Sequence, residues 1–312
     1  MKFDIVGIND SYGSHRFSNN SILYALKDNV TQDSNLVFVW WVEKMFLDPK
    51  YSDIADRLCN TDWFGVMHVP LLTPNWAMYS QNNLSKLYFS HKWRLALSRC
   101  KGIIVLSEHM KVQLQALYPS LPVFSMKHPI GSTAGEFSPQ SFKEDPKLLL
   151  VGAWLRDFDS FFHLKTNFRK VILLNKYADG YLKDIYGKYS PDIRRKIRDI
   201  DCIEFLENDE YDKLLSSSLV YLGLHETSAN NALCECISSS VPFVSKNHPA
   251  ITEYCGIDYP LFFNDALDLS TIEYEKVIEA HHYLKDNYKL KEMLSIDSFV
   301  DSVASIYIKI ID

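Results

Sequence analysis

Short apolar runs alternate with amphipathic segments along the chain, and this alternation predicts parallel sheets wrapped by helices. In the first half the apolar runs predict strands over 3–7, 36–41, 63–68, 102–106 and 123–127. In the second half they predict strands over 148–152, 170–174, 202–206, 219–222 and 242–245. Helices are expected over 20–27, 83–98, 108–117 and 230–239, and over 296–310 near the end. The pattern indicates an α/β protein with two Rossmann-like, doubly wound parallel sheets.

A break in this alternation divides the chain. The segment 128–146, HPIGSTAGEFSPQSFKEDP, is rich in Gly, Pro and Ser and has little periodicity, as is typical of a connection between domains. A length of 312 residues also fits two hydrophobic cores better than one. We therefore expect an N-terminal domain over 1–135, a second domain over 136–295 and a final segment, 296–312, that packs back across the join.

Composition narrows the classes of function. The net charge of -6 and the pI near 5.9 argue against an extended nucleic-acid-binding surface. Six cysteines without a CxxC pair favour free thiols in a reducing compartment. The start of the chain does not resemble a signal peptide, and no apolar run is long enough to span a membrane, so a cytoplasmic location is expected. The basic segment 183–198 leaves two readings open: a solvated helix face, or contact with an anionic acceptor or the periphery of a membrane.

The turn after the predicted strand 219–222 carries the strongest chemical signal. Ligands of open parallel sheets bind at the carboxyl ends of strands, and this turn, GLHETSANNALCE, leads into a helix. Backbone amides around Ser228, Ala229, Asn230 and Asn231 could hold a phosphate at the helix start. About one turn further, Glu235 could accept both hydroxyls of a ribose. On spacing alone, Ser228 could equally be an N-cap and Glu235 an exposed helix residue.

The wider segment carries a resemblance to a known family. The run 225–256, HETSANNALCECISSSVPFVSKNHPAITEYCG, resembles the donor-binding signature of retaining GT-B glycosyltransferases. The segments KGIIVLSEHMKVQL (101–114), HPIGSTAGEF (128–137) and LLLVGAWLR (148–156) are similar to family segments in the same order. The resemblance implies two Rossmann-like domains that face a central cleft. It also implies a hexosyltransferase-like enzyme that uses a UDP- or GDP-sugar and acts with retention. No metal is expected, because the helix start and Arg156 would supply the positive potential that a metal would otherwise provide.

The resemblance also assigns site residues, starting with the donor. The family's first glutamate would fall at Thr227, with Glu226 beside it, so both are candidate donor contacts. Arg156, after the strand that opens the second domain, could neutralise the departing diphosphate, although it could also be an ordinary surface arginine. Lys176 is a substitute for the lysine that the family places nearby. Asp157 and Asp159 are the nearest approach to a metal-binding DxD motif.

The resemblance implies that the first domain binds the acceptor. His68 ends an apolar strand and would support the reaction centre, although a neutral core histidine fits the position equally well. Gly13, Ser14, His15 and Arg16 in the first turn are candidate contacts to the acceptor, which would be a glycan, a lipid-linked compound or a protein. Tryptophans in VFVWWVEK and TPNWAM could line the acceptor cleft or pack in the core.

Two other functions fit the same features. A GT-B-fold sugar-nucleotide epimerase would cleave the same bond, and it would form product from the donor alone. A protein that binds a nucleotide sugar with little or no turnover would fit the absence of a glutamate at Thr227. A nicotinamide dehydrogenase is disfavoured, because no Gly-x-Gly-x-x-Gly follows the first strand of either half.

Overall fold

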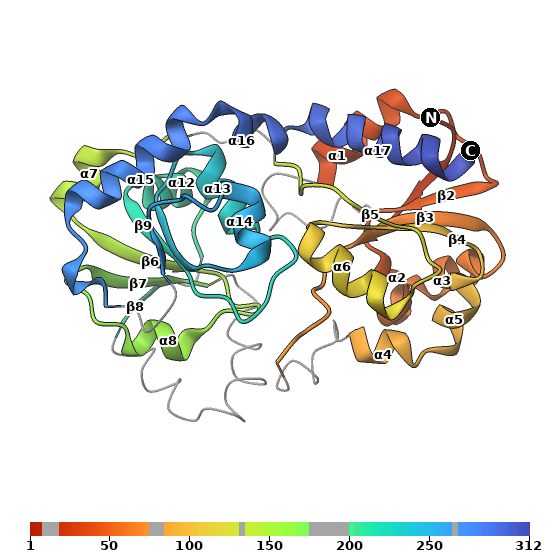
Figure 1. Cartoon of the computed structure of the whole chain (residues 1–312), viewed down its shortest axis with the longest axis horizontal. Helices are drawn as coiled ribbons and strands as arrows, with labels where there is room; N and C mark the ends of the chain where they lie inside the picture. Colours follow the sequence, from red (N-terminus) through yellow and green to blue (C-terminus); the bar gives the residue numbers. More distant parts are fainter. Residues whose placement is uncertain (8–18, 75–83, 131–134, 175–199, 204, 264–267) are drawn as a thin grey trace. The chain divides into compact units, whose positions relative to one another are not determined.

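The chain forms two compact α/β units (Figure 1). The computed structural model describes residues 1–7, 19–74, 84–130, 135–174, 200–203, 205–263 and 268–312. Unit 1 comprises Met1–Gly131 and Met293–Asp312, and unit 2 comprises Ser132–Glu292. The division at 131/132 lies close to the 135/136 boundary expected from the sequence, and the C-terminal segment belongs to unit 1.

The described residues of unit 1 form five parallel strands in the order β1 (Asp4–Val6), β2 (Leu36–Val39), β3 (Asp62–Met67), β4 (Cys100–Val105) and β5 (Val123–Ser125). The strands are apolar on both sides because helices cover both faces of a buried parallel sheet. Phe3 packs against Phe38 and Phe64 in this core. At Gly65 in β3 an added Cβ would lie 2.6 Å from the Val39 carbonyl oxygen, so only glycine allows the close approach to β2.

The helices of unit 1 form two groups. On one face α1 (Asn19–Asn29) packs beside the C-terminal helix α17 (Ile296–Ile311), and on the other lie α2 (Val42–Leu47), α3 (Ser52–Leu58) and α5 (His91–Leu97) (Figure 1). The helix predicted over 83–98 is two helices, α4 (Leu84–Tyr88) and α5. The break occurs because the Ser90 side chain accepts a hydrogen bond from the Trp93 amide and caps α5. Ser107 caps α6 (Glu108–Leu117) in the same way, because its side chain accepts a hydrogen bond from the Met110 amide.

In the described part of unit 2 there are six parallel strands, in the order β11-β10-β9-β6-β7-β8. These are β6 (Lys147–Val151), β7 (Arg169–Leu173), β8 (Asp201–Ile203), β9 (Ser218–Leu222), β10 (Phe243–Lys246) and β11 (Phe262–Phe263). From β6 the chain builds outward to β8, then returns to place β9 on the other side of β6 and builds away in the opposite direction. The point where the strand order reverses therefore lies between β6 and β9.

The helices of unit 2 include two that border this point. They are α13 (Asn231–Ser238), which follows β9, and α8 (Phe158–His163), which follows β6. The described residues also form α7 (Pro139–Glu144), α12 (Asn208–Ser216), α14 (Pro249–Cys255) and α15 (Tyr274–Asp286), and α16 (Tyr288–Met293) leads back to unit 1. Residues Ala232–Ile237 of α13 are all buried, so this helix is fixed firmly against its sheet.

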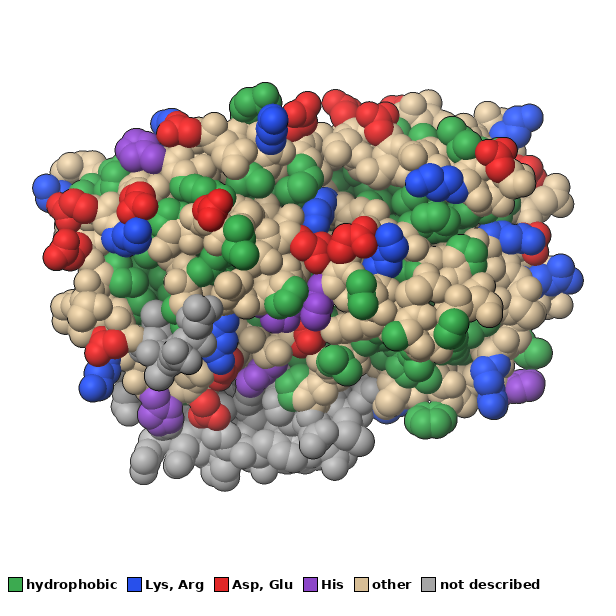
Figure 2. Space-filling model, in the orientation of Figure 1, with side chains coloured by type: hydrophobic (Ala, Val, Ile, Leu, Met, Phe, Trp, Pro, Cys, Tyr) green, Lys and Arg blue, Asp and Glu red, His purple; other side chains and the backbone are tan. Residues whose placement is uncertain are grey.

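The surface charges and the cysteines are as expected from the composition. On the face drawn in Figure 2, acidic and basic side chains are intermixed over both units. All six cysteines are free thiols, and three of them are buried in unit 2. None of the helices in the described part of the chain is long and apolar enough to cross a membrane.

Candidate functional site

Two loops meet where the strand order of unit 2 reverses, and backbone bonds join them. The loop after β6 covers 152–157 and the loop after β9 covers 223–230. The Asp157 amide donates to the Gly223 carbonyl at 2.9 Å, and the His225 amide donates to the Leu155 carbonyl at 3.0 Å. In open parallel sheets ligands bind beyond the carboxyl ends of the strands, at the point where the strand order reverses. These two loops are the candidate site.

Arg156 is fixed in the first loop by its own backbone neighbours. Its side chain is nearly buried, with 9% exposed. Nε donates to the Val151 carbonyl at 2.8 Å and Nη1 donates to the Trp154 carbonyl at 3.1 Å. Nη2 lies 3.5 Å from Oδ1 of Asn230 in the second loop. The reading of Arg156 as an ordinary surface arginine is therefore wrong, and its guanidinium lies beside the start of α13.

Asn230, and not Ser228, is the N-cap of α13. Its side-chain oxygen accepts a hydrogen bond from the Leu233 amide at 3.3 Å, and the helix begins at Asn231. Ser228 is fully buried and Thr227 is 4% exposed, whereas Asn231 is exposed. Amides at the start of a helix carry partial positive charge, and here a buried guanidinium adds a full one. The arrangement can attract an anion such as a phosphate.

One reading of the sequence was that Glu235 is an exposed helix residue, and this reading is wrong. Its side chain in α13 is buried, with 6% exposed. The carboxylate accepts a hydrogen bond from the hydroxyl of Tyr211 in α12. A buried carboxylate needs such a donor, because removing a charge from water without a partner is costly. Tyr211 therefore fixes the carboxylate from the side of α12.

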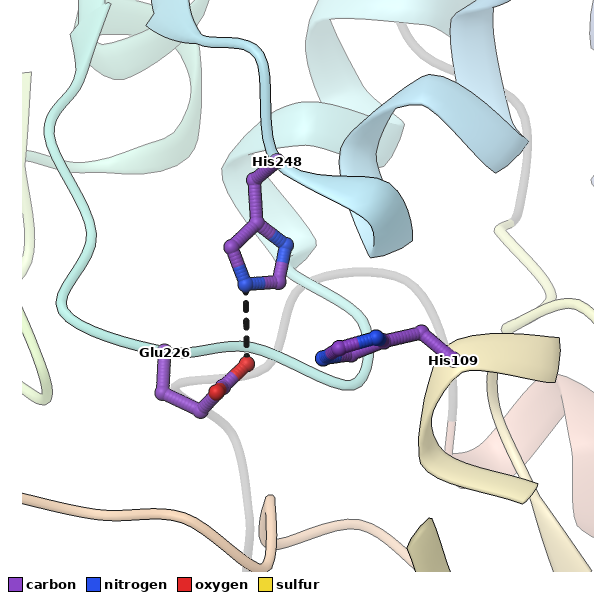
Figure 3. A group of neighbouring side chains, drawn as sticks. All are labelled: His109, Glu226 and His248. Carbon is purple, nitrogen blue, oxygen red and sulfur yellow. Dashed lines mark ion pairs between the residues drawn. The ribbon is translucent and has the colours of Figure 1, made fainter. Parts of the chain in front are cut away.

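A second carboxylate in the site is paired with a histidine from the next strand end. Glu226 is 8% exposed, and its Oε1 lies 2.9 Å from Nε2 of His248, which follows β10 (Figure 3). The same oxygen accepts a hydrogen bond from the Thr227 amide at 2.9 Å. Nδ1 of His248 accepts from the Ala250 amide at 3.2 Å. Because Nδ1 is an acceptor, the proton of the neutral ring is assigned to Nε2, which faces Glu226.

The histidine predicted in unit 1 lies among aromatic rings at the end of β3. The His68 ring centroid is 4.8 Å from that of Trp40, 5.2 Å from that of Trp41 and 6.1 Å from that of His128. Its backbone amide donates to Glu43. Trp40 is 1% exposed and Trp41 is half-buried, so core packing accounts for the first of these tryptophans.

The remaining predicted residues fall into two groups. Gly13, Ser14, His15, Arg16 and Lys176 lie outside the described residues, as do the basic segment 183–198 and Trp76. Ala229 lies in the loop before α13. Asp157 is the N-cap of α8, and its Oδ1 accepts from the Ser160 amide at 3.0 Å.

Three residues that lie at these places were not assigned from the sequence. They are Tyr211, His248 and Glu43. Only His248 had a usable signal, since it follows a predicted strand and precedes a proline, a residue that favours the first position of a helix. The other two make contacts that depend on how distant segments pack.

Comparison with known proteins supports the fold. No protein-family model matches the sequence, and no curated protein matches it. Among solved structures, HepE of Anabaena in complex with UDP and glucose has a TM-score of 0.65 at 10% identity and covers 99% of both chains. Sucrose-phosphate synthase of Thermosynechococcus elongatus has a TM-score of 0.59 at 9% identity, covering 93% of this chain and 76% of its own.

TarM has a TM-score of 0.57 at 12% identity. The match covers 94% of this chain, which spans 58% of the length of TarM. A mutant of TarM from S. aureus is a second similar structure, and it was solved in complex with UDP. These similar proteins share two parallel α/β sheets, here of five and six strands, in the arrangement called GT-B. The chain therefore has the GT-B fold.

Proposed function

We propose that the protein is a glycosyltransferase that moves a sugar from a UDP- or GDP-sugar to a hydroxyl group of an acceptor. The donor diphosphate binds at the start of α13 beside Arg156, and the ribose hydroxyls bind Glu235. The observation that carries the proposal is the nearly buried guanidinium of Arg156 beside the N-cap Asn230, where the strand order reverses. The GT-B fold adds support, because HepE was solved on this fold with UDP and glucose bound.

The guanidinium of Arg156, together with the amides at the start of α13, would also accelerate the proposed reaction. As the bond from the sugar to the diphosphate breaks, negative charge builds on the leaving phosphate. A guanidinium and helix amides aimed at that charge lower the barrier most when they need not move during the reaction. Arg156 meets this condition, because the Val151 and Trp154 carbonyls already hold two of its nitrogens.

Glu226 and His248 are proposed to contact the donor sugar. Glu226 lies in the loop before α13 and His248 follows the next strand, β10. The His248 side chain is partly accessible, with 19% exposed, and 10% of the Glu226 side chain is exposed. A carboxylate accepts hydrogen bonds from sugar hydroxyls, and an imidazole can donate or accept one. Thr227 stands where the resembled family has a glutamate, so Glu226 supplies the carboxylate from the adjacent position.

The acceptor is proposed to bind at unit 1, with His68 near the reaction centre. The acceptor class is a glycan, a lipid-linked compound or a protein. Transfer is proposed to occur with retention, so that the donor phosphate helps to take up the proton of the acceptor hydroxyl, and without a metal ion. Nuclear magnetic resonance of the product's anomeric proton tests retention, and transfer in the presence of EDTA tests the metal proposal.

The direct experiment is incubation with a panel of UDP- and GDP-sugars, with release of the nucleoside diphosphate as the signal. One donor should be consumed, faster when a glycan acceptor is present. Glu235→Gln should raise the KM for that donor by about tenfold or more, in keeping with the loss of charge-assisted bonds to ribose. The matched control is Glu144→Gln, which changes an exposed glutamate of unit 2. If no donor binds or is hydrolysed, and Glu235→Gln changes nothing, the proposal is wrong.

A further inference from the structure

Glu43 is a buried acidic residue that the proposed donor site does not use. It lies in the first turn of α2 and is 1% exposed. Transfer of a carboxyl group into an apolar interior is costly unless hydrogen bonds compensate. The hydrogen bonds of the Glu43 carboxyl group therefore indicate its structural role.

One oxygen of Glu43 accepts two hydrogen bonds from the backbone. Oε1 accepts from the amide of His68 at 2.6 Å and from the amide of Val69 at 2.6 Å. These are the first residues after β3 ends at Met67. Among the described residues, Oε2 has no hydrogen-bond partner. One carboxyl oxygen thus accepts hydrogen bonds from the backbone amides of the two residues that follow β3.

The segment that carries Glu43 also holds the ring of His68. Trp40 and Trp41 directly precede α2, and their ring centroids lie 4.8 and 5.2 Å from that of His68. The backbone and the ring of His68 are therefore both held by residues 40–43. A contact to the backbone alone would leave the ring free to rotate, and a contact to the ring alone would leave the strand end free to shift.

We propose that Glu43 is a positioning residue that fixes His68 at the end of β3. The inference rests on the proposed function for the role of His68, but the geometry of Glu43 can be tested separately. The required property is an acceptor oxygen at the position of Oε1, and a glutamine side chain offers the same oxygen without a charge. Loss of the acceptor would leave two amides unsatisfied and would allow His68 to move, and a misplacement of about 1 Å can cost about 100-fold in rate.

The test compares three variants of the full chain in the transfer reaction. Glu43→Ala should lower kcat by about 10- to 100-fold, while the Kd for UDP, which binds unit 2 in the proposal, stays unchanged. Glu43→Gln should restore most of kcat. Ser90→Ala is the matched control, because it removes the cap of α5 in the same unit without touching His68. A large loss of kcat in Glu43→Gln would overturn the proposal, since it would mean that the negative charge acts in the chemistry.

A second readout does not need activity. The His68 ring resonance, assigned by its disappearance in His68→Gln, should shift in Glu43→Ala and keep its position in Glu43→Gln and Ser90→Ala. If Glu43→Ala does not fold, Glu43→Asp replaces it, because the shorter side chain withdraws the acceptor. An unchanged His68 resonance and unchanged kcat in the variant without the acceptor would overturn the inference. Absence of any transfer by the wild-type protein would instead count against the proposed function, and the resonance would still decide the role of Glu43.

Discussion

Replacing Glu43 with glutamine should remove a pH dependence from the stability of unit 1. Burial raises the pKa of Glu43 from an ordinary value of 4.5 to about 7, although backbone hydrogen bonds from Val69 and His68 lower it. One pKa unit corresponds to about 1.4 kcal/mol, so ionisation of this carboxyl costs the folded state about 3 kcal/mol. Glutamine has a similar shape and carries no ionisable proton.

The sign follows from where each state loses its proton. The unfolded chain releases the Glu43 proton near pH 4.5, and the folded chain retains it until about pH 7. Between these values the folded state binds more protons, so stability falls as the pH rises, and the loss is complete above pH 7. Tyr88 on α4 and His68 after β3 face the same region and are present in both proteins. The pKa of Tyr88 is raised above its usual range by burial, by Tyr118 and by Glu43.

Urea unfolding followed by tryptophan fluorescence is a suitable assay. Trp40, Trp63 and Trp93 are buried in unit 1, so the signal reports mainly on that unit. Between pH 4.5 and about pH 8 the stability of Glu43→Gln relative to wild type should rise by about 3 kcal/mol. The exposed control Glu144→Gln should follow the wild-type curve. Parallel curves for Glu43→Gln and wild type would refute the reasoning, because they would mean that Glu43 titrates alike in both states.

Substitutions at three further positions test other contacts. Tyr211→Phe removes the donor to buried Glu235 and should cost about 1–3 kcal/mol of stability, measured by urea unfolding, and should weaken UDP binding; unchanged values would show that the bond is not formed. Ser240 has a φ of 52° and accepts a hydrogen bond from Lys291, so Ser240→Gly should be more stable than Ser240→Ala by about 1 kcal/mol, and the reverse order would contradict strain at this turn. Gly65→Ala places a Cβ 2.6 Å from a carbonyl oxygen of β2 and should lower stability by about 1–3 kcal/mol; an unaffected midpoint of unfolding would argue against the close strand approach.

The strands were predictable because their residues are buried on both sides and so form continuous apolar runs. The predicted strand 219–222 and β9 (Ser218–Leu222) agree almost completely, as do the helix 108–117 and α6. Shorter elements were not predictable from periodicity. β11 is Phe262–Phe263 alone, and α14 (Pro249–Cys255) spans barely two turns.

The candidate site was predictable in its position and less so in its contacts. A turn rich in small and polar residues after a buried strand identified the start of α13. The local sequence did not distinguish Asn230 from Ser228 as its N-cap, because both residue types favour that position. Tyr211 with Glu235, and Glu43 with His68, are 24 and 25 residues apart in the chain. Such pairs are set by how a helix packs beside a neighbouring strand or helix, and no local pattern encodes that.

The most direct measurement of the central claim is a calorimetric titration of UDP and GDP into the wild-type protein and two arginine variants. Arg156→Ala should weaken nucleotide binding by about 10- to 100-fold, as expected when a charged hydrogen-bonding partner of a phosphate is lost. Arg169→Ala removes an arginine of the same unit whose side chain is 47% exposed and pairs with Asp145 and Asp201, and it should bind as wild type does. Equal affinities for all three proteins, or no binding of either nucleotide, would contradict a donor site at the start of α13.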